Sequence, residues 1–283
     1  MRHFVCRLAA CAAGAFSYSA IAQEKPADTL PLWELGGGVA GAWLPDYRGS
    51  DEARGYVLPF PYFVYRGEFL RADREGVRAK FFEFERVELD VSLGGTVPVN
   101  STSNRARAGM PDLRPTLEVG PVLIVHLARD ADGINKLDFR APIRRAITWK
   151  DGSLRDVGTL FFPNINLDRR VFMGGQRWNF GVVAGAYFGD RRYHDYFYGV
   201  APEFATSTRP AYVARSGFAG WQGIVALSAR IGRAWVGGFA KGDSLRGAVF
   251  EDSPLVRKRE NFSAGLGVSY VFAESRERVP ASR

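Results

Sequence analysis

Few residues of this 283-residue sequence have the chemistry of a catalytic site. Gly242-Asp243-Ser244-Leu245 has the form of a hydrolase nucleophile block, but only about forty residues follow it and none of them is histidine. A nucleophilic serine needs a general base within hydrogen-bond reach. Past the first segment only His126 and His194 remain, and although triads are assembled in space, no spacing here selects one. We therefore predict no catalytic residue and keep a barrel-borne lipid hydrolase as the weakest alternative.

The sequence also lacks a recognisable cofactor or metal site. Gly36, Gly38 and Gly41 satisfy G-x-G-x-x-G, but the dinucleotide-binding form must open a helix, and Ala42-Trp43-Leu44-Pro45 follows instead. No spacing of His, Asp and Glu indicates a metal site, and calcium at the carboxylates near residues 46–52 is left open. We predict no cofactor and no metal.

Residues 1–22 have the order of a cleaved signal peptide. Arg2 and Arg7 form a basic start, an apolar centre follows, and Ala20-Ile21-Ala22 is a small-x-small cleavage site before polar residues. We predict export, with cleavage after Ala22. Leu8-Ala9-Ala10-Cys11 has the local form of a lipobox, but Arg7 directly before it leaves no apolar core ahead of such a cut.

Cysteine and charge content restrict the exported chain further. Cys6 and Cys11 are the only cysteines and both lie in the signal segment, so the exported chain has no disulfide or cysteine metal site. Removing residues 1–22 leaves 36 basic against 30 acidic residues, a net charge of +6. The basic residues are scattered along the chain without a long run, so we predict no nucleic-acid partner.

The main pattern of the exported chain is alternation of apolar and polar residues. Val87, Leu89, Val91 and Leu93 interleave with polar residues, which at period two places the aliphatic side chains on one face of a strand. Similar runs recur to Phe272. Twelve strands are predicted, near 33–43, 56–65, 68–74, 76–84, 87–97, 114–128, 135–149, 154–168, 176–188, 218–230, 233–243 and 259–272.

The connections between these strands are of two kinds. The long ones, at 44–55, 98–113, 189–217 and 244–258, all fall on one side, and short turns fall on the other. Outer-membrane barrels have this asymmetry, with short periplasmic turns and long external loops. We predict an all-β transmembrane barrel of about 12 antiparallel strands over residues 23–272. The alternative is a soluble β-sandwich. Strands of ten or more residues are long for a sandwich and suit a tilted membrane span.

Period two also assigns side chains to the two faces of the wall. Aromatic residues at strand ends could form interfacial girdles, although each taken alone could equally be a core residue. They are Trp33, Trp43, Tyr62, Tyr65, Trp149, Trp178, Phe188, Trp235, Tyr270 and Phe272. Charged residues of both signs take inward phases, and we expect them to pair and largely fill the interior. They are Glu34, Glu88, Asp90, Glu118, Asp138, Arg140, Arg144, Asp156, Arg177 and Arg230.

Three strings in the long connections resemble the MipA/OmpV family of outer-membrane proteins. They are Pro45-Asp46-Tyr47-Arg48-Gly49-Ser50-Asp51, Asp195-Tyr196-Phe197-Tyr198-Gly199-Val200 and Asp252-Ser253-Pro254-Leu255-Val256. The resemblance extends in order and spacing over essentially the whole exported chain. It implies a non-enzymatic barrel in the outer membrane of a Gram-negative cell envelope, in contact with outer-membrane lipid. Family members are described as scaffolds joining murein synthases to lytic transglycosylases, or as surface and osmotically regulated proteins.

The last strand resembles the signal that directs outer-membrane barrels to insertion. Gly267, Tyr270 and Phe272 occupy its glycine and two aromatic positions. Such proteins often end at the final aromatic residue, whereas here residues 273–283 continue as a mostly polar stretch. We predict that this stretch is a periplasmic tail.

Three functions follow as hypotheses. The first is a scaffold or surface adhesin, the second a narrow passive channel for small polar solutes, and the third the hydrolase. Adhesion would map to residues 45–55 and 191–210, which are rich in tyrosine and arginine. Scaffold contacts would map to the periplasmic turns and tail, through Arg129, Asp130, Arg169, Arg170, Arg276 and Arg278.

Overall fold

A computed structural model describes residues 29–66, 70–73, 76–79, 82–84, 86–130 and 135–280. The predicted signal peptide and its cleavage site at Ala20 and Ala22 lie outside the described residues. Over the described part of the chain, no helix is long and apolar enough to cross a membrane.

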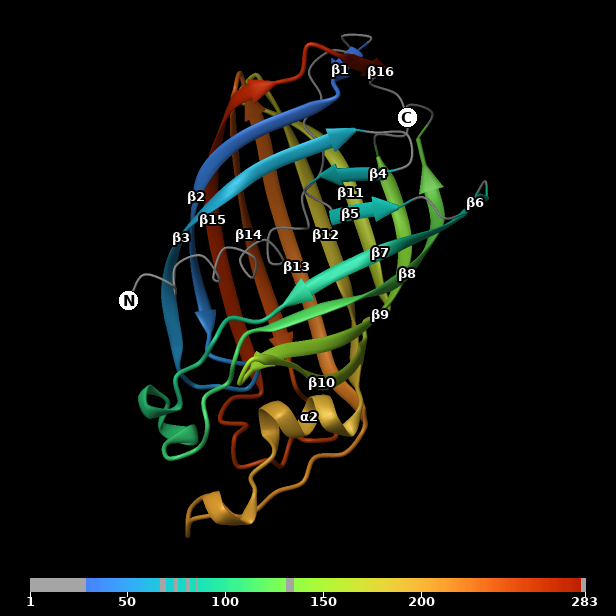
Figure 1. The fold of residues 1–283 in the computed structure, drawn as a ribbon. Helices are drawn as coiled ribbons and strands as arrows, with labels where there is room; N and C mark the ends of the chain where they lie inside the picture. Colours follow the sequence, from blue (N-terminus) through green and yellow to red (C-terminus); the bar gives the residue numbers. More distant parts are fainter. Residues whose placement is uncertain are drawn as a thin grey trace.

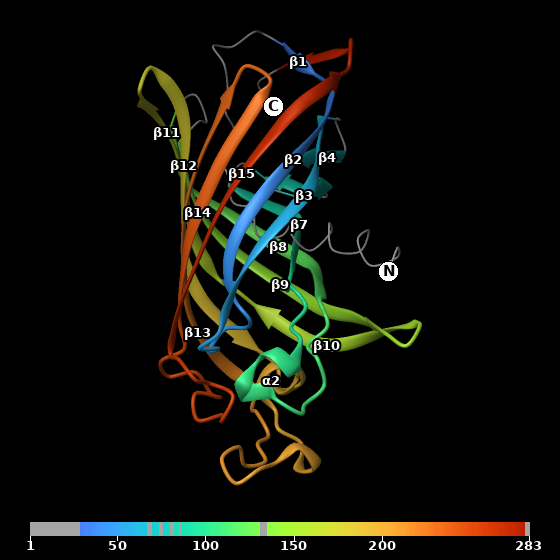
Figure 2. The ribbon, with the colours of Figure 1, turned by 90° about the vertical axis from the view of Figure 1, so that its left-hand side faces the viewer.

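Antiparallel strands form one 14-stranded sheet that curves into a barrel (Figures 1 and 2). The order is β5-β4-β3-β2-β15-β14-β13-β12-β10-β9-β8-β7-β6, with β11 between β9 and β12, and β5 lies against β7 to bring the ends of the sheet together. The predicted fold class is therefore confirmed. The long strands are β2 (Trp33–Pro45), β3 (Ala53–Arg66), β7 (Val87–Gly95), β8 (Thr116–Arg129), β9 (Lys136–Lys150), β10 (Ser153–Phe161), β11 (Asn164–Met173), β12 (Gln176–Gly189), β13 (Gly217–Ile231), β14 (Ala234–Ser244) and β15 (Glu260–Glu274).

Two of the predicted strands each contain two strands of the structure. The predicted strand 76–84 contains β5 (Gly76–Ala79) and β6 (Phe82–Phe84), and β4 (Leu70–Asp73) precedes them. The predicted strand 154–168 is β10 and the first half of β11. It breaks at Phe162-Pro163 because proline has no amide hydrogen for the ladder, and β10 and β11 then pair with successive parts of β9.

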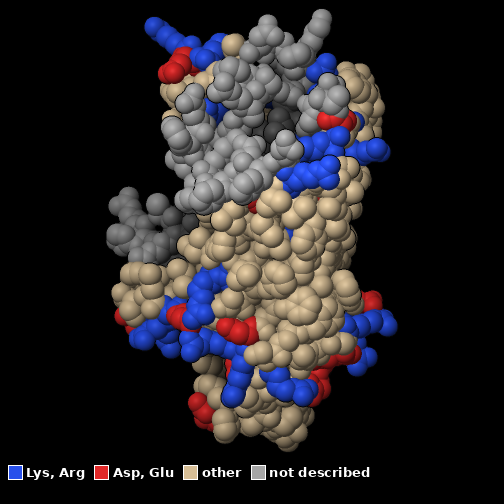
Figure 3. Space-filling model, turned by 90° about the vertical axis from the view of Figure 1, so that its right-hand side faces the viewer, with Lys and Arg blue, Asp and Glu red and all other residues tan. Residues whose placement is uncertain are grey.

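The outer wall carries apolar side chains in the predicted phase. Val57 and Leu266 are about three quarters exposed, at 75% and 74%, and the visible face in Figure 3 has a mostly uncharged band between charged ends. Trp43, Trp149, Phe188, Tyr270 and Phe272 are exposed on this wall, whereas Trp33, Tyr65 and Trp178 are half-buried. A belt of this kind is the surface that a barrel presents to lipid.

The girdle prediction is wrong for Tyr62 and Trp235, which are 5% and 4% exposed. Both take inward phases of their strands. The Tyr62 hydroxyl donates to Glu34 Oε2 at 3.1 Å. A side chain on Gly237 would meet the Trp235 ring at 2.6 Å, so this glycine makes room for the indole.

The two ends of the described chain meet at the short-turn end of the barrel (Figure 1). β1 (Thr29–Pro31) pairs with β16 (Arg278–Pro280) as a separate two-stranded ribbon. Ser275 fastens it, because its hydroxyl accepts from the Trp33 amide at 3.1 Å and donates to the Glu277 carbonyl at 2.7 Å. The stretch predicted as a tail therefore begins inside β15, and its residues 278–280 form β16.

Candidate functional site

The four long connections pack together over the end of the barrel opposite the β1–β16 ribbon (Figure 2). We call residues 46–52, 96–115, 190–216 and 245–259 the cap. Each contributes buried apolar side chains to one core, among them Tyr47, Leu113, Phe197 and Phe250. The cap contains the only α-helix of the described residues, α2 (Arg191–Tyr198), and the short 3₁₀ turns η2 (Ser101–Ser103), η3 (Arg105–Arg107) and η4 (Pro202–Phe204).

Helix α2 is attached directly to the barrel wall. Asp190 precedes it and accepts from the Tyr193 amide at 2.8 Å, as an N-capping carboxylate does. Its second oxygen accepts from the Thr159 amide of β10 at 2.8 Å. A side chain on Gly158 would meet the Tyr193 backbone nitrogen at 2.4 Å, so glycine permits this close approach.

The three strings that carry the family resemblance meet inside the cap. The Tyr47 hydroxyl donates to the Leu255 carbonyl at 2.8 Å, and the Tyr198 hydroxyl donates to the Arg48 carbonyl at 2.9 Å. The Ser253 hydroxyl closes the set by donating to the Tyr198 carbonyl at 2.7 Å. All of these groups except Arg48 belong to buried residues, so the strings form one interlocked knot of loops.

Other residues of the strings hold the same loops. Gly49 has a φ of 97°, a left-handed conformation that favours glycine, and its amide donates to Asn261 Oδ1 at 2.6 Å. Asp195 Oδ1 accepts from the Ala214 amide at 2.6 Å. The Tyr196 hydroxyl donates to the Arg114 carbonyl at 2.8 Å. The remaining string residues Pro45, Asp46, Ser50, Gly199 and Pro254 lie at the end of β2 or within the cap.

His194 is fully buried in the cap core. Its Nδ1 lies 2.6 Å from the Arg215 carbonyl oxygen, so Nδ1 carries the hydrogen, and its ring meets Phe250 edge to face at 4.6 Å between centroids. Nε2 has no partner among the described residues. Burial lowers the pKa of this imidazole, which is a neutral core residue and not a base beside a serine.

The other catalytic candidates also have different surroundings. His126 Nδ1 lies 2.8 Å from Asp138 Oδ1, and its Nε2 lies 3.6 Å from Glu88 Oε2, inside the barrel. Ser244 is half-buried at the end of β14, where it pairs with Trp221 and Glu260. Among the described residues no hydrogen bond joins a serine hydroxyl to either histidine.

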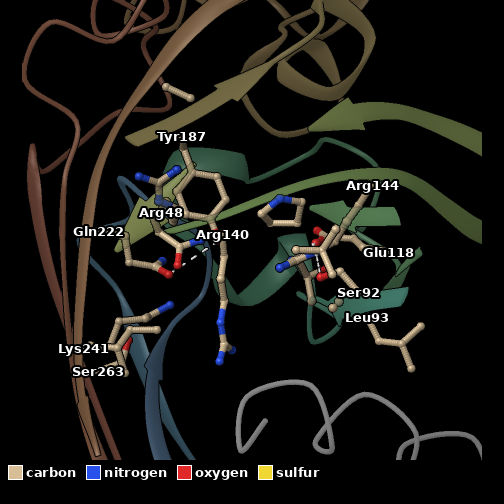
Figure 4. A pocket seen from close by; sticks show the side chains of 18 of the residues that line it. Arg48, Ser92, Leu93, Glu118, Arg140, Arg144, Tyr187, Gln222, Lys241 and Ser263 are labelled. Carbon is tan, nitrogen blue, oxygen red and sulfur yellow. Dashed lines mark hydrogen bonds and ion pairs between the residues drawn. The ribbon is translucent and has the colours of Figure 1, made fainter. Parts of the chain in front are cut away.

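Beneath the cap, the lumen contains a cavity of about 310 Å³. Residues of the cap close the cavity at one end, and strand residues with inward phases form its walls. Figure 4 shows side chains from several strands and from the first cap segment converging on it. The cap residues that line it include Arg48, Tyr193, His194, Phe197, Tyr198 and Phe250.

Six of the ten charged residues predicted for the interior form ion pairs with one another. Arg144 Nη1 lies 3.3 Å from Glu118 Oε2, and both side chains are 7% exposed. Arg230 lies 2.8 Å from Glu34 Oε1. Arg140 lies 3.3 Å from Asp138 Oδ2, and Glu88 and Asp90 also line the cavity.

Two members of the predicted interior list lie at the rims instead. Asp156 lies near the cap, where its Oδ2 pairs with Arg145 at 2.5 Å. The side chain of Arg145 is half-exposed. Arg177 stacks over Phe172 at 5.5 Å near the tip of the β11–β12 hairpin. The strands extend beyond the closed part of the wall at these points, so period two no longer distinguishes lumen from exterior there.

The carboxylates named from the sequence as possible calcium ligands pair with arginines. Among the described residues, no group of three or more His, Cys, Asp and Glu side chains could hold a metal ion. Asp46 pairs with Arg54 at 2.8 Å, and Glu52 pairs with Arg105 at 2.7 Å. Asp46 therefore links the first cap segment to β3, and Glu52 links it to the second cap segment.

Comparison with known proteins assigns the family. The family model described as MltA-interacting protein MipA matches residues 37–272, and the chain therefore belongs to the MipA family. No curated protein matches the chain.

Among solved structures, an outer membrane channel from Pseudomonas putida F1 has 11% identity and a TM-score of 0.42, with 89% of this chain and 100% of that chain covered. A Pseudomonas aeruginosa FadL homologue has 10% identity and a TM-score of 0.28, with 89% and 73% covered. Likenesses this low carry no functional argument.

Proposed function

We propose that this outer-membrane barrel is a scaffold that docks a murein-cleaving enzyme at its periplasmic end. The observation that carries the proposal is the cap. Its core closes the external end with fully buried side chains such as Leu245 and Phe250. A barrel closed in this way acts more readily through its surfaces than as a steady pore, and the family description names an interaction with MltA.

The charge of the short-turn end supports this assignment. Where side-chain exposure is described, the turns and the last residues at this end expose six arginines against the carboxylates of Asp130 and Glu277. Charge complementarity across an interface accelerates encounter and selects partners. The exposed arginines are Arg86, Arg129, Arg169, Arg233, Arg276 and Arg278.

Four of the five arginines among the partner contacts predicted from the sequence are exposed, namely Arg129, Arg169, Arg276 and Arg278, whereas Arg170 is half-buried. Arg129 Nη2 lies 2.6 Å from His126 Nδ1. Asp130 is also exposed and accepts hydrogen bonds from the backbone amide and the side-chain amide of Asn135 at 3.1 and 2.6 Å. Arg169, Arg276 and Arg278 are therefore the residues to test.

The test is binding of a purified periplasmic lytic transglycosylase to the barrel in detergent. Reversing Arg169, Arg276 and Arg278 to Glu together should weaken binding by roughly ten-fold or more, the effect of about 1.4 kcal/mol. The matched control reverses Arg246, Arg257 and Lys258 on the cap, which are also exposed. We call the combined reversal of Arg169, Arg276 and Arg278 the rim reversal. Undiminished binding by the rim reversal, or no binding by the wild type, would reject the scaffold.

The same pair of variants addresses the adhesin alternative. Adhesion would use the outer side of the cap, so cell-surface attachment would fall with the cap reversal and not with the rim reversal. The channel alternative requires the cap to open. We assign no enzymatic activity, because both described histidines are engaged in buried contacts away from serine hydroxyls.

A further inference from the structure

The luminal cavity has one wall that is largely apolar. β2 and β3 are neighbours in the sheet, and their inward side chains Ala42, Leu44, Tyr56 and Leu58 line the cavity. A wide polar pore has no need of such a surface, since porin interiors are polar. This wall provides contact area for an apolar group.

A cationic corner lies next to that wall, on β14 and the first cap segment. Arg48 Nε donates to Asp243 Oδ1 at 2.9 Å, and Lys241 Nζ lies 3.4 Å from Asp243 Oδ2. Gln222 Nε2 also donates to Asp243 Oδ1, at 2.8 Å. One carboxylate thus stands between two cations, and the corner retains one positive charge. Figure 4 labels Arg48, Gln222 and Lys241 on this side of the cavity.

This corner has unused hydrogen-bonding capacity. Arg48 Nη2 is buried and has no partner among the described residues. The Ser263 hydroxyl, which lies across from Lys241 on β15, is also buried and without a partner there. Buried polar groups normally have partners, and a guanidinium matches the geometry of a carboxylate or phosphate.

The Arg48 guanidinium is held in place for such a role. Its Cζ lies 4.6 Å from the centre of the Tyr187 ring. Its own backbone carbonyl accepts the Tyr198 hydroxyl in the cap. A cation fixed on both sides loses little freedom when it binds an anion.

The sheet order brings the two features together. β14, β15, β2 and β3 are neighbours in the sheet, in this order. Ser263 is opposite Lys241, and the next residue, Ala264, is opposite Trp43 on β2, directly before Leu44. The cationic corner and the apolar wall are therefore adjoining parts of one surface.

We propose that the lumen beneath the cap binds an amphipathic organic anion. Its carboxylate or phosphate would lie at Arg48, Lys241 and Ser263, and its apolar chain or ring against Leu44 and Leu58. The cavity of about 310 Å³ is at the small end of the range of roughly 300–1,000 Å³ that ligand sites occupy, which limits the ligand to a small molecule or one chain of a lipid. This site does not depend on the scaffold role.

The test uses the whole barrel in phosphatidylcholine nanodiscs, with empty nanodiscs subtracted, and octanoate as the probe. Calorimetry should show saturable binding to one site. Acetate, which lacks the apolar body, and octylammonium, which reverses the charge, should each bind at least roughly ten-fold more weakly.

Two variants assign the two halves of the site. Lys241→Met should weaken octanoate binding roughly ten-fold or more, and its control is Lys258→Met on the exposed cap. Leu58→Ala should weaken octanoate and leave acetate unchanged, and its control is Leu266→Ala on the lipid-facing wall. Heat-modifiable migration on a gel shows that each variant still folds.

The outcomes separate the proposal from its competitors. Equal binding of octylammonium and octanoate, or octanoate binding unchanged in both luminal variants, would overturn it. Competition by phosphatidylglycerol added to the nanodiscs would support it with a membrane lipid as the source of the anion. Octanoate binding without that competition would support it with a soluble anion.

Discussion

Tyr198 and Phe250 stack face to face, with ring centroids 3.7 Å apart and ring planes 11° apart. Tyr198 ends α2 and Phe250 lies in the last cap segment, so the stack joins two connections through residues that are 52 positions apart in the sequence. His194 packs edge to face on the same Phe250 ring. The cap is therefore held by aromatic packing in addition to the hydrogen bonds of its knot.

Phe250→Ala should loosen the cap without unfolding the barrel. A fully buried phenylalanine contributes about 3–5 kcal/mol when truncated to alanine. Amide exchange should therefore accelerate in residues 190–216 and 245–259, while the strands stay protected and the gel shift on boiling is kept. Phe262→Ala, on the exposed wall, is the control. Unchanged exchange in both cap segments would show that the stack is dispensable.

The closed cap also predicts electrical behaviour. The wild-type barrel in a planar bilayer should show no steady openings, because the cap core obstructs the external mouth. Phe250→Ala should produce frequent openings under the same conditions. Steady conductance by the wild type would favour the passive-channel function and would mean that the cap opens at rest.

Cap stability should fall as the pH falls below the ordinary histidine pKa of about 6.5. Burial lowers the pKa of His194 in the folded cap. As the pH falls, the unfolded cap therefore takes up a proton before the folded cap does. Between the ordinary pKa and the lowered pKa, the folded cap loses stability relative to the unfolded cap. Nδ1 already donates to the Arg215 carbonyl, so the proton would enter at the unpartnered Nε2. Asp190 and Asp195 oppose the shift, and Arg48 adds to it.

The measurement is protease cleavage of the cap between pH 7.5 and 5. His194→Asn keeps a donor for the Arg215 carbonyl and has no proton to gain, so its cleavage rate should not rise with acid. A wild-type rate that is flat over this interval, or a variant that follows the wild type, would contradict the assignment.

The sequence predicted the wall better than the cap. Period two placed Glu34, Glu118 and Arg144 in the lumen because a strand repeats regularly and each face has one environment. It failed for Tyr62 and Trp235, since aromatic identity suggested a girdle while phase indicated the interior. The knot of Tyr47, Tyr198 and Ser253 could not be derived, because loops have no period and its contacts span 55, 150 and 208 positions.

The Arg144–Glu118 pair predicts a large stability effect. Arg144→Met leaves Glu118 buried with the Tyr193 hydroxyl at 3.1 Å, and breaking a buried pair costs about 3–5 kcal/mol. The double variant Arg144→Met, Glu118→Leu should recover much of that loss. Urea unfolding in detergent micelles measures both. A single variant as stable as the wild type would mean that lumen water solvates the carboxylate.

Export provides the remaining prediction. If Ala20-Ile21-Ala22 is the cleavage site, the protein recovered from the outer-membrane fraction begins at Gln23 and has the mass of residues 23–283. Ala20→Lys should block cleavage, because the position must be small and uncharged, and should leave the full-length precursor in the inner membrane. Lipidation at Cys11 would instead give a longer chain with a fatty-acyl mass increment, so the mass spectrum of the mature protein distinguishes the two routes.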